Sequence, residues 1–198
     1  GEEEGFRWFA ASVFTFGFGS LILLPLYPVI LVDRFQISLF QVAVLANITN
    51  VVWMLSFAFW GRYVDVRNPL RATAANVCLA ILCPLNYFFA ALAPHPVVWF
   101  LVPSAVLFGV TNAGIELAYF NSVLRFADEN RASHYQALFS GLLGIRGCVA
   151  PFIGGALAVL FSGKHWDLCY IFLLGASIML AGAWMQIVGV RREAARVM

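Results

Sequence analysis

The stretch WFAASVFTFGFGSLILLPLYPVILV, from Trp8 to Val32, decides the fold class of this chain because it contains no charged residue. About 20 largely apolar residues let an α-helix cross a hydrocarbon layer about 30 Å thick, whereas β-barrel spans are shorter and alternate in polarity. Five similar stretches follow: Leu39 to Trp60, Ala72 to Leu92, Val97 to Leu124, Ala137 to Phe161 and Leu168 to Val190. The sequence therefore predicts an all-α membrane protein, a bundle of six transmembrane helices in a lipid bilayer.

The composition excludes a water-soluble domain. Hydrophobic residues make up 62% of the chain and charged residues 11%, whereas about a quarter of the residues in a soluble domain are charged. The cations lie in the loops that flank the spans rather than on one continuous face, so we expect no nucleic-acid partner. The cysteines lie in apolar spans without paired metal-ligand spacing, so we predict no metal site and no cofactor.

The distribution of Lys and Arg predicts the orientation of the chain. Nine arginines lie at one set of helix ends, whereas the other ends carry only Arg34 and Lys164. Cations in short loops stay on the cytoplasmic side, so we expect both termini there, in a bacterial inner membrane. We divide the chain into an acidic cytoplasmic linker (1–7), a six-helix transmembrane domain (8–190) and a basic cytoplasmic tail (191–198).

The loop after the second span carries a family resemblance. The sequence GRYVDVRNPLR, from Gly61 to Arg71, resembles the G-x-x-x-D-x-x-G-R-R loop of the major facilitator superfamily, which joins the second and third helices of each six-helix half. Gly61 and Asp65 match in register, and Arg67 and Arg71 are displaced from the family's basic pair. Asn68 replaces the second glycine, and because asparagine tolerates positive φ we expect it to keep a tight turn.

The resemblance implies that this loop latches one conformation of a carrier. Gly61 would let a neighbouring helix approach closely, and Asp65 would accept hydrogen bonds from a helix N-terminus or an arginine. In the fifth span, Pro151-x-x-Gly154-Gly155 is similar to the end of the family's G-P-x-x-G-G motif. Together with Gly147, these residues would allow close helix packing.

Members of that family have twelve helices in two halves, so the chain would be one half of a major-facilitator-type fold. Its acidic start without Met, its degenerate loop and its short basic tail favour the C-terminal half of a longer protein. The partner would be the missing six-helix half or a second copy of the chain.

Two charged residues lie well inside the predicted spans, Glu116 and Arg146. Each lies ten residues from the end of its span, which puts both about 15 Å deep at 1.5 Å per residue. We therefore hypothesise a salt bridge between them. Two roles remain open: a mobile pair in which Glu116 exchanges a proton or binds a cation, or a permanent bridge that fixes helix packing.

A polar stripe extends from this pair. Asn112, Glu116 and Tyr119 recur at i, i+4 and i+7, which predicts one helix face. The resemblance implies that this face lines the central cavity, because the first and fourth helices of each half do so in the family. Ordinary hydrogen bonding between helices is the alternative.

The first span should bend. Pro25 and Pro28 cannot continue a regular helical ladder, and broken helices often border the binding sites of transporters. A kinked, cavity-lining first helix is therefore expected.

These observations favour half of a secondary active transporter that moves a small-molecule substrate by alternating access, coupled to an ion gradient. A non-transporting membrane scaffold or sensor on the same fold is the alternative. An intramembrane enzyme is disfavoured: Gly175-Ala176-Ser177 resembles a nucleophile motif, but the histidines that could serve as a base, His95, His134 and His165, lie in predicted loops. We therefore assign no catalytic residue.

Overall fold

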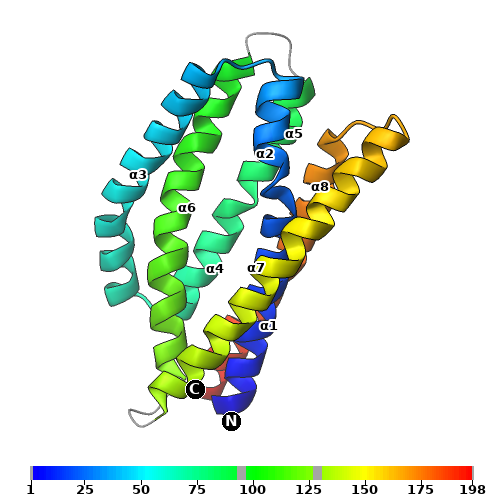
Figure 1. The fold of residues 1–198 in the computed structure, drawn as a ribbon. Helices are drawn as coiled ribbons and strands as arrows, with labels where there is room; N and C mark the ends of the chain where they lie inside the picture. The colour runs from blue at the N-terminus through cyan, green and yellow to red at the C-terminus, as the bar shows by residue number, and fades with distance from the viewer. Residues whose placement is uncertain (1, 93–96, 127–130, 198) are drawn as a thin grey trace.

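The computed structural model describes residues 2–92, 97–126 and 131–197, and within them every regular element is a helix (Figure 1). In chain order the elements are α1 (Glu2–Leu23), α2 (Leu26–Val29), a π-helix (Ile30–Arg34), α3 (Leu39–Val66), α4 (Pro69–Ala80), α5 (Leu82–Leu92), α6 (Val97–Arg125), α7 (Ala132–Gly163) and α8 (Cys169–Val197).

The six predicted spans are confirmed. In the described part of the chain, six helical segments are long and apolar enough to cross a membrane. α1, α2 and the π-helix form the first span, and α4 and α5 form the third. α1 begins and α8 ends at the same end of the bundle, which we call the terminal end (Figure 1). Residues 2–7 and 191–197, which we had separated as a linker and part of a tail, continue α1 and α8 as helix.

The expected bend in the first span is confirmed. α1 ends at Leu23, a turn follows at Leu24 and Pro25, and the chain then continues through α2 into the π-helix. In the π-helix the backbone N–H of Phe35 donates to the carbonyl of Ile30 at 2.9 Å. Proline lacks an N–H group and clashes with the carbonyl four residues before it, so the helix cannot continue regularly through Pro25.

The third span is also interrupted, which the sequence analysis did not predict. α4 ends at Ala80 and α5 begins at Leu82 and contains Pro84. Because Pro84 cannot donate to the carbonyl of Ala80, the regular helical ladder is lost at this point.

Close packing at glycines holds the centre of the bundle. α8 packs against α1, while α6 packs against α3 and α4. A side chain at Gly182 of α8 would overlap the backbone of Phe16 on α1. A Cβ at Gly109 of α6 would lie 2.6 Å from the carbonyl oxygen of Thr49 on α3. Small residues let membrane helices approach this closely, which favours their association.

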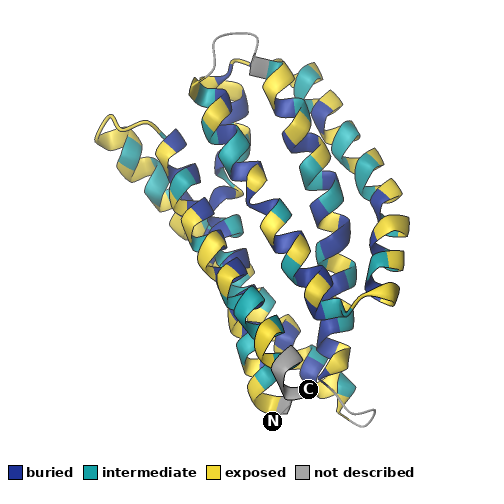
Figure 2. Cartoon of the chain, turned by 180° about the vertical axis from the view of Figure 1, so that it is seen from behind, coloured by how far each residue is buried: buried dark blue, intermediate teal, exposed yellow. Residues whose placement is uncertain are grey.

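Two spans differ from the other four in burial. In the most apolar part of α3, 6% of the residues are buried, and in that of α7 11%, against 39–44% in the other spans. Figure 2 shows this for α3, the outermost helix on its right, where exposed and intermediate residues predominate. Within this chain, α3 and α7 therefore leave most of their surface uncovered.

Candidate functional site

Arg146 projects from α7 onto the backbone of α1. Its Nη1 donates a hydrogen bond to the carbonyl oxygen of Val13 at 2.8 Å. A side chain at Gly17, one turn further along α1, would overlap the guanidinium group. The bare backbone at Gly17 therefore provides the space in which this cation lies.

The predicted salt bridge between Glu116 and Arg146 is not formed. Glu116 is exposed on α6 and makes no hydrogen bond or ion pair within the described residues. Depth along the helix fixes only one coordinate of a side chain, and α7 packs mainly along α1 rather than α6. The guanidinium group therefore meets a carbonyl of α1 instead of the carboxylate on the neighbouring helix.

Tyr119 lies inside the bundle between α1 and α7. The residue is 5% exposed, and its ring makes edge contacts with Phe9 of α1 and Phe139 of α7, at centroid distances of 6.4 and 6.0 Å. Its hydroxyl group is buried and has no hydrogen-bond partner in the described part of the chain. A buried hydroxyl without a partner carries an unrecovered desolvation cost.

The polar stripe is thus divided between two faces of α6. Asn112 and Glu116 are exposed, whereas Tyr119 points into the core. The three positions lie within a sector of about 60° around the helix axis, at about 100° per residue, and the boundary between core and surface passes through that sector. Arg146 and Tyr119 come together at the junction of α1, α6 and α7, while Glu116 and Asn112 face outward.

Sequence reasoning missed a buried polar cluster at the other side of α6. Asn76 of α4 is completely buried and donates from Nδ2 to the carbonyl of Thr111 at 3.1 Å, and its Oδ1 has no partner among the described residues. Trp60 donates from Nε1 to the carbonyl of Val110 at 2.8 Å. A side chain at Gly114 would overlap Asn76. Asn76 itself, a polar residue between apolar neighbours in the third span, is the sequence signal that could have revealed this cluster.

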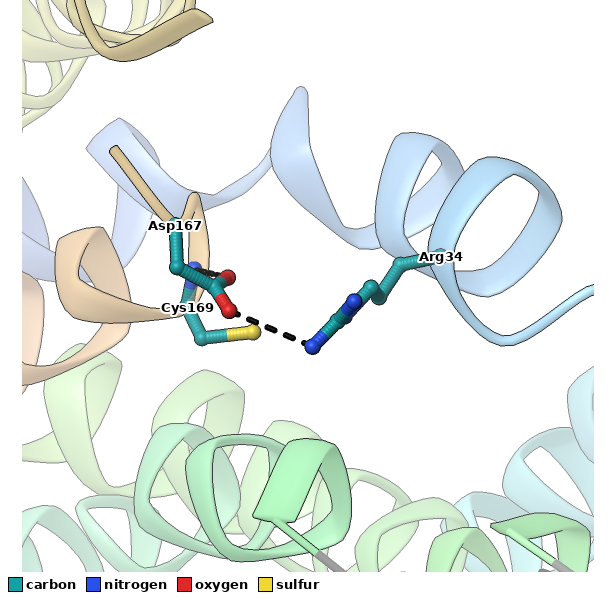
Figure 3. A network of polar contacts seen from close by, with 3 residues as sticks. All are labelled: Arg34, Asp167 and Cys169. Carbon is teal, nitrogen blue, oxygen red and sulfur yellow. Dashed lines mark hydrogen bonds and ion pairs between the residues drawn. The ribbon is translucent and has the colours of Figure 1, made fainter. Parts of the chain in front are cut away.

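At the end of the bundle opposite the terminal end, an ion pair joins the first span to α8 (Figure 3). Arg34 Nη2 lies 3.2 Å from Asp167 Oδ2, and the backbone N–H of Cys169 donates to Asp167 Oδ1 at 3.0 Å. Partial burial alone would raise the pKa of Asp167, but the hydrogen bond from Cys169 and the charge of Arg34 hold this pKa below its usual value. The carboxylate therefore stays ionised and ties the two helix ends together.

The histidines and Ser177 are not brought together with these groups in the part of the chain that the structure describes. The described residues contain no cluster of His, Cys, Asp and Glu that could hold a metal ion. His165 lies in the loop before α8, His134 lies in the first turn of α7 rather than in the predicted loop, and His95 is outside the described residues. Ser177 donates to the carbonyl of Leu173 on its own helix at 2.8 Å, as a structural serine does.

Comparison with protein families matches residues 3–151 to the Major Facilitator Superfamily. The chain belongs to this superfamily. The match covers most of the chain, and with six apolar helices it fits one half of the superfamily's fold, in an integral membrane protein. The superfamily is in general one of transporters rather than enzymes. A search of curated proteins gave no match.

The superfamily loop takes a different local form from the one expected. Asn68 does not adopt positive φ: its φ is −66° and its ψ 134°, and its side chain accepts a hydrogen bond from the N–H of Leu70 at 2.9 Å as the N-cap of α4. The physical reason is Pro69, which restricts the preceding residue to extended backbone and is itself favoured at the first helical position.

The other residues of the loop do not form a latch within this chain. Gly61 lies inside α3, and a Cβ there would meet no atom within 4 Å. Asp65, Arg67 and Arg71 are exposed and form no ion pair in the residues that the structure describes. Their role as a latch therefore stays a prediction about a partner outside this chain.

The superfamily-like glycines of α7 differ in what surrounds them. A side chain at Gly154 would overlap the carbonyl group of Ile22, so this glycine sets the contact between α7 and α1. Gly147 and Gly155 have no atom within 4 Å of a built Cβ, and Pro151 lies inside the helix between them. One glycine thus packs within the chain, whereas the other two have open space around them.

Proposed function

We propose that this chain is one six-helix half of a secondary active transporter, which moves a small solute across the membrane by alternating access and is coupled to an ion gradient. The observation that carries the proposal is that two oppositely charged residues, Glu116 and Arg146, lie well inside apolar helices of membrane-spanning length and do not pair with each other. Ionisable groups in a membrane are costly and usually face a water-filled path or a partner.

Glu116 is the residue that we assign to ion coupling. It is exposed on α6 with Asn112 one turn away, and the described part of this chain provides neither with a partner on another helix. An exposed carboxylate at this depth would be unstable against lipid tails, so we infer that a hydrated cavity lies in front of α6. The carboxylate can bind and release a proton from such a cavity as access changes sides.

A second six-helix unit would close the cavity. α3 and α7 leave most of their surface uncovered, and α7 presents Gly144 and Gly155 on an open face. The other half of a longer chain, or a second copy, would pack there and leave the site between two bundles, as in transporters built from repeats. The exposed Asp65, Arg67 and Arg71 would then contact that unit.

The proposed orientation places the terminal end in the cytoplasm of a bacterial cell. The loop between α3 and α4 and the ends of α1, α6, α7 and α8 carry most of the cations, whereas the opposite end carries Arg34 and Lys164. This asymmetry favours an inward-facing terminal end.

Accessibility of Asn112 tests the transport mechanism. In the full chain with its native cysteines replaced, Asn112→Cys should react with a membrane-impermeant thiol reagent from both sides of a vesicle. The ratio of the two rates should shift when a proton gradient is imposed, and reverse when the gradient is reversed. Leu180→Cys, an exposed position on α8, is the control and should react from neither side.

Glu116→Gln separates coupling from folding. The variant should remain accessible at Asn112→Cys but should no longer respond to the gradient, because the amide cannot exchange the proton. In a scaffold or sensor, the cysteine of Asn112→Cys would react from one side only, whatever gradient is imposed. That result would refute alternating access. Unchanged coupling together with reduced folding in Glu116→Gln would assign Glu116 to packing instead.

A further inference from the structure

We propose that Arg146 and Tyr119 form the binding site for the carboxylate of a singly charged anionic solute, an assignment of substrate class that rests on the proposed transport function. Neither residue has a partner that satisfies it in the described residues. The geometry around each donor indicates which kind of ligand is missing.

The guanidinium group of Arg146 keeps one edge free. Its Nη1 is bound to the carbonyl of Val13, whereas Nε is buried and has no acceptor, and Nη2 makes no hydrogen bond in the described part of the chain. The N–H of Nε and one N–H of Nη2 point in the same direction, which is the edge that a carboxylate contacts with two parallel hydrogen bonds. The free edge is therefore the one suited to bidentate binding.

The charge of Arg146 is also uncompensated. Arg7 pairs with Glu3, Arg34 with Asp167 and Arg125 with Glu193, whereas Arg146 forms no ion pair with a described residue. A backbone carbonyl supplies a dipole but no net charge, so the half-buried cation keeps most of its desolvation cost. A bound anion would recover that cost, whereas a cationic solute would increase it.

Tyr119 adds a third donor at the contact of α1, α6 and α7. Its hydroxyl group is buried and has no acceptor among the described residues, and its ring is held by Phe9, one turn before Val13, and by Phe139, two turns before Arg146. Three unsatisfied donor groups beside one net positive charge match an acceptor with one negative charge. A carboxylate neutralises the site, whereas a phosphate dianion would leave an excess charge in the membrane.

The site is pre-organised by α1. The guanidinium group lies in the space left by the missing side chain of Gly17 and is fixed by its bond to Val13. Less side-chain freedom is therefore lost when an anion binds, which favours affinity. Glu116, exposed on α6, does not occupy the free edge.

Protection of Arg146 from chemical modification tests the site. The full chain in lipid nanodiscs would be treated with phenylglyoxal, and modification of each arginine followed by mass spectrometry. Acetate and benzoate should slow modification of Arg146, and choline chloride at the same ionic strength should not. Arg131, the exposed N-cap of α7, should be modified at the same rate with every probe.

Two variants identify the donors. Tyr119→Phe keeps the ring and removes the hydroxyl group, and it should raise the benzoate concentration needed for half-protection of Arg146 roughly tenfold, the effect of one hydrogen bond to a charged group. Arg146→Lys keeps the charge without the fork, and it should lose the thermal stabilisation that benzoate gives to the unmodified chain. The protection assay itself uses the unmodified chain, so a variant that fails to fold does not decide the outcome.

Three results would overturn the assignment: no protection by either carboxylate, equal protection of Arg131, or stronger protection by inorganic phosphate than by benzoate. The outcome is independent of the transport test. Protection without alternating accessibility of Asn112→Cys would leave an anion-binding membrane protein that does not transport. Alternating accessibility without protection would leave a transporter for another class of solute.

Discussion

The two faces of α7 differ in how they are covered within the described residues. One face follows α1, with Tyr135 against Phe6, Phe139 against Phe9, and Gly154 against Ile22. The other face carries Gly144 and Gly155, where a Cβ would meet no atom of the described residues within 4 Å. The first face is fixed by packing within the chain, and the second contributes little to the stability of the six helices. A substitution should therefore cost stability on the first face and function on the second.

The same contrast distinguishes whole spans. α1, α4, α6 and α8 bury their side chains against one another, while α3 contacts the bundle mainly along α6. In a membrane the uncovered surface of α3 and α7 is not penalised for being apolar, since lipid tails are as apolar as leucine. Burial inside the chain therefore identifies the positions at which the fold, rather than the lipid, demands a particular residue.

The largest effect is expected at Gly154. Its replacement by alanine would push a methyl group into the carbonyl of Ile22, and we expect a loss of about 1–3 kcal/mol, as for other overpacked sites. The measurement is the apparent Tm in detergent by tryptophan fluorescence. Gly155→Ala is the matched control, about 100° around the helix from Gly154, and should be neutral or slightly stabilising, because alanine is the better helix former. Equal losses in the two variants would contradict the division of α7 into two faces.

The elements that the sequence predicted correctly depend on strong local signals. A span of 20 or more apolar residues can be a membrane helix in almost any context, and Pro25 bends the first span whatever surrounds it. The turn at Asn68 is also locally determined, but by Pro69, which restricts the preceding residue to extended backbone. These features need no knowledge of which helices are neighbours.

The site could not be derived in the same way, because it depends on rotation and on the choice of neighbour. The sequence placed Glu116 and Arg146 at equal depth, yet the partner of Arg146 is determined by the gap at Gly17 on α1. Tyr119 shares a helical stripe with Glu116, but it turns inward since Phe9 and Phe139 form a pocket for its ring. Such contacts arise only when three helices are packed together.

A smaller loss of stability is expected when a buried asparagine is replaced, and an exposed asparagine should show almost none. Asn76 is buried and bonds across helices to Thr111, whereas Asn47 is exposed and donates to the carbonyl of Ala43 on its own helix at 2.8 Å. Asn76→Ala should lower stability by about 1 kcal/mol, a typical upper value for one hydrogen bond between membrane helices. Asn47→Ala should stay within about 0.5 kcal/mol. Thermal unfolding of both variants under one condition decides this, and a greater loss at Asn47 would show that α3 is packed against more than α6.

The smallest effect should come from the exposed ion pair between Arg34 and Asp167. Because the pKa of Asp167 is lowered in the fold, its contribution to stability is present above about pH 4, the ordinary Asp value, and is lost as pH falls through the lowered pKa. Both side chains are partly exposed, at 53% and 40%, so we expect no more than about 1 kcal/mol. Asp167→Asn should therefore have a slightly lower Tm than the unmodified chain at pH 6, and the difference should shrink on acidification towards pH 3.

Asp33→Asn is the matched control for that measurement, because Asp33 lies at the same end of the bundle and its side chain forms no ion pair with any described residue. Its Tm should follow that of the unmodified chain at every pH. A difference for Asp167→Asn that stays constant between pH 6 and pH 3 would contradict this expectation, because the lost stability would then not depend on the ionisation of the carboxylate. The charge of Arg34 would then add nothing to the connection between the first span and α8.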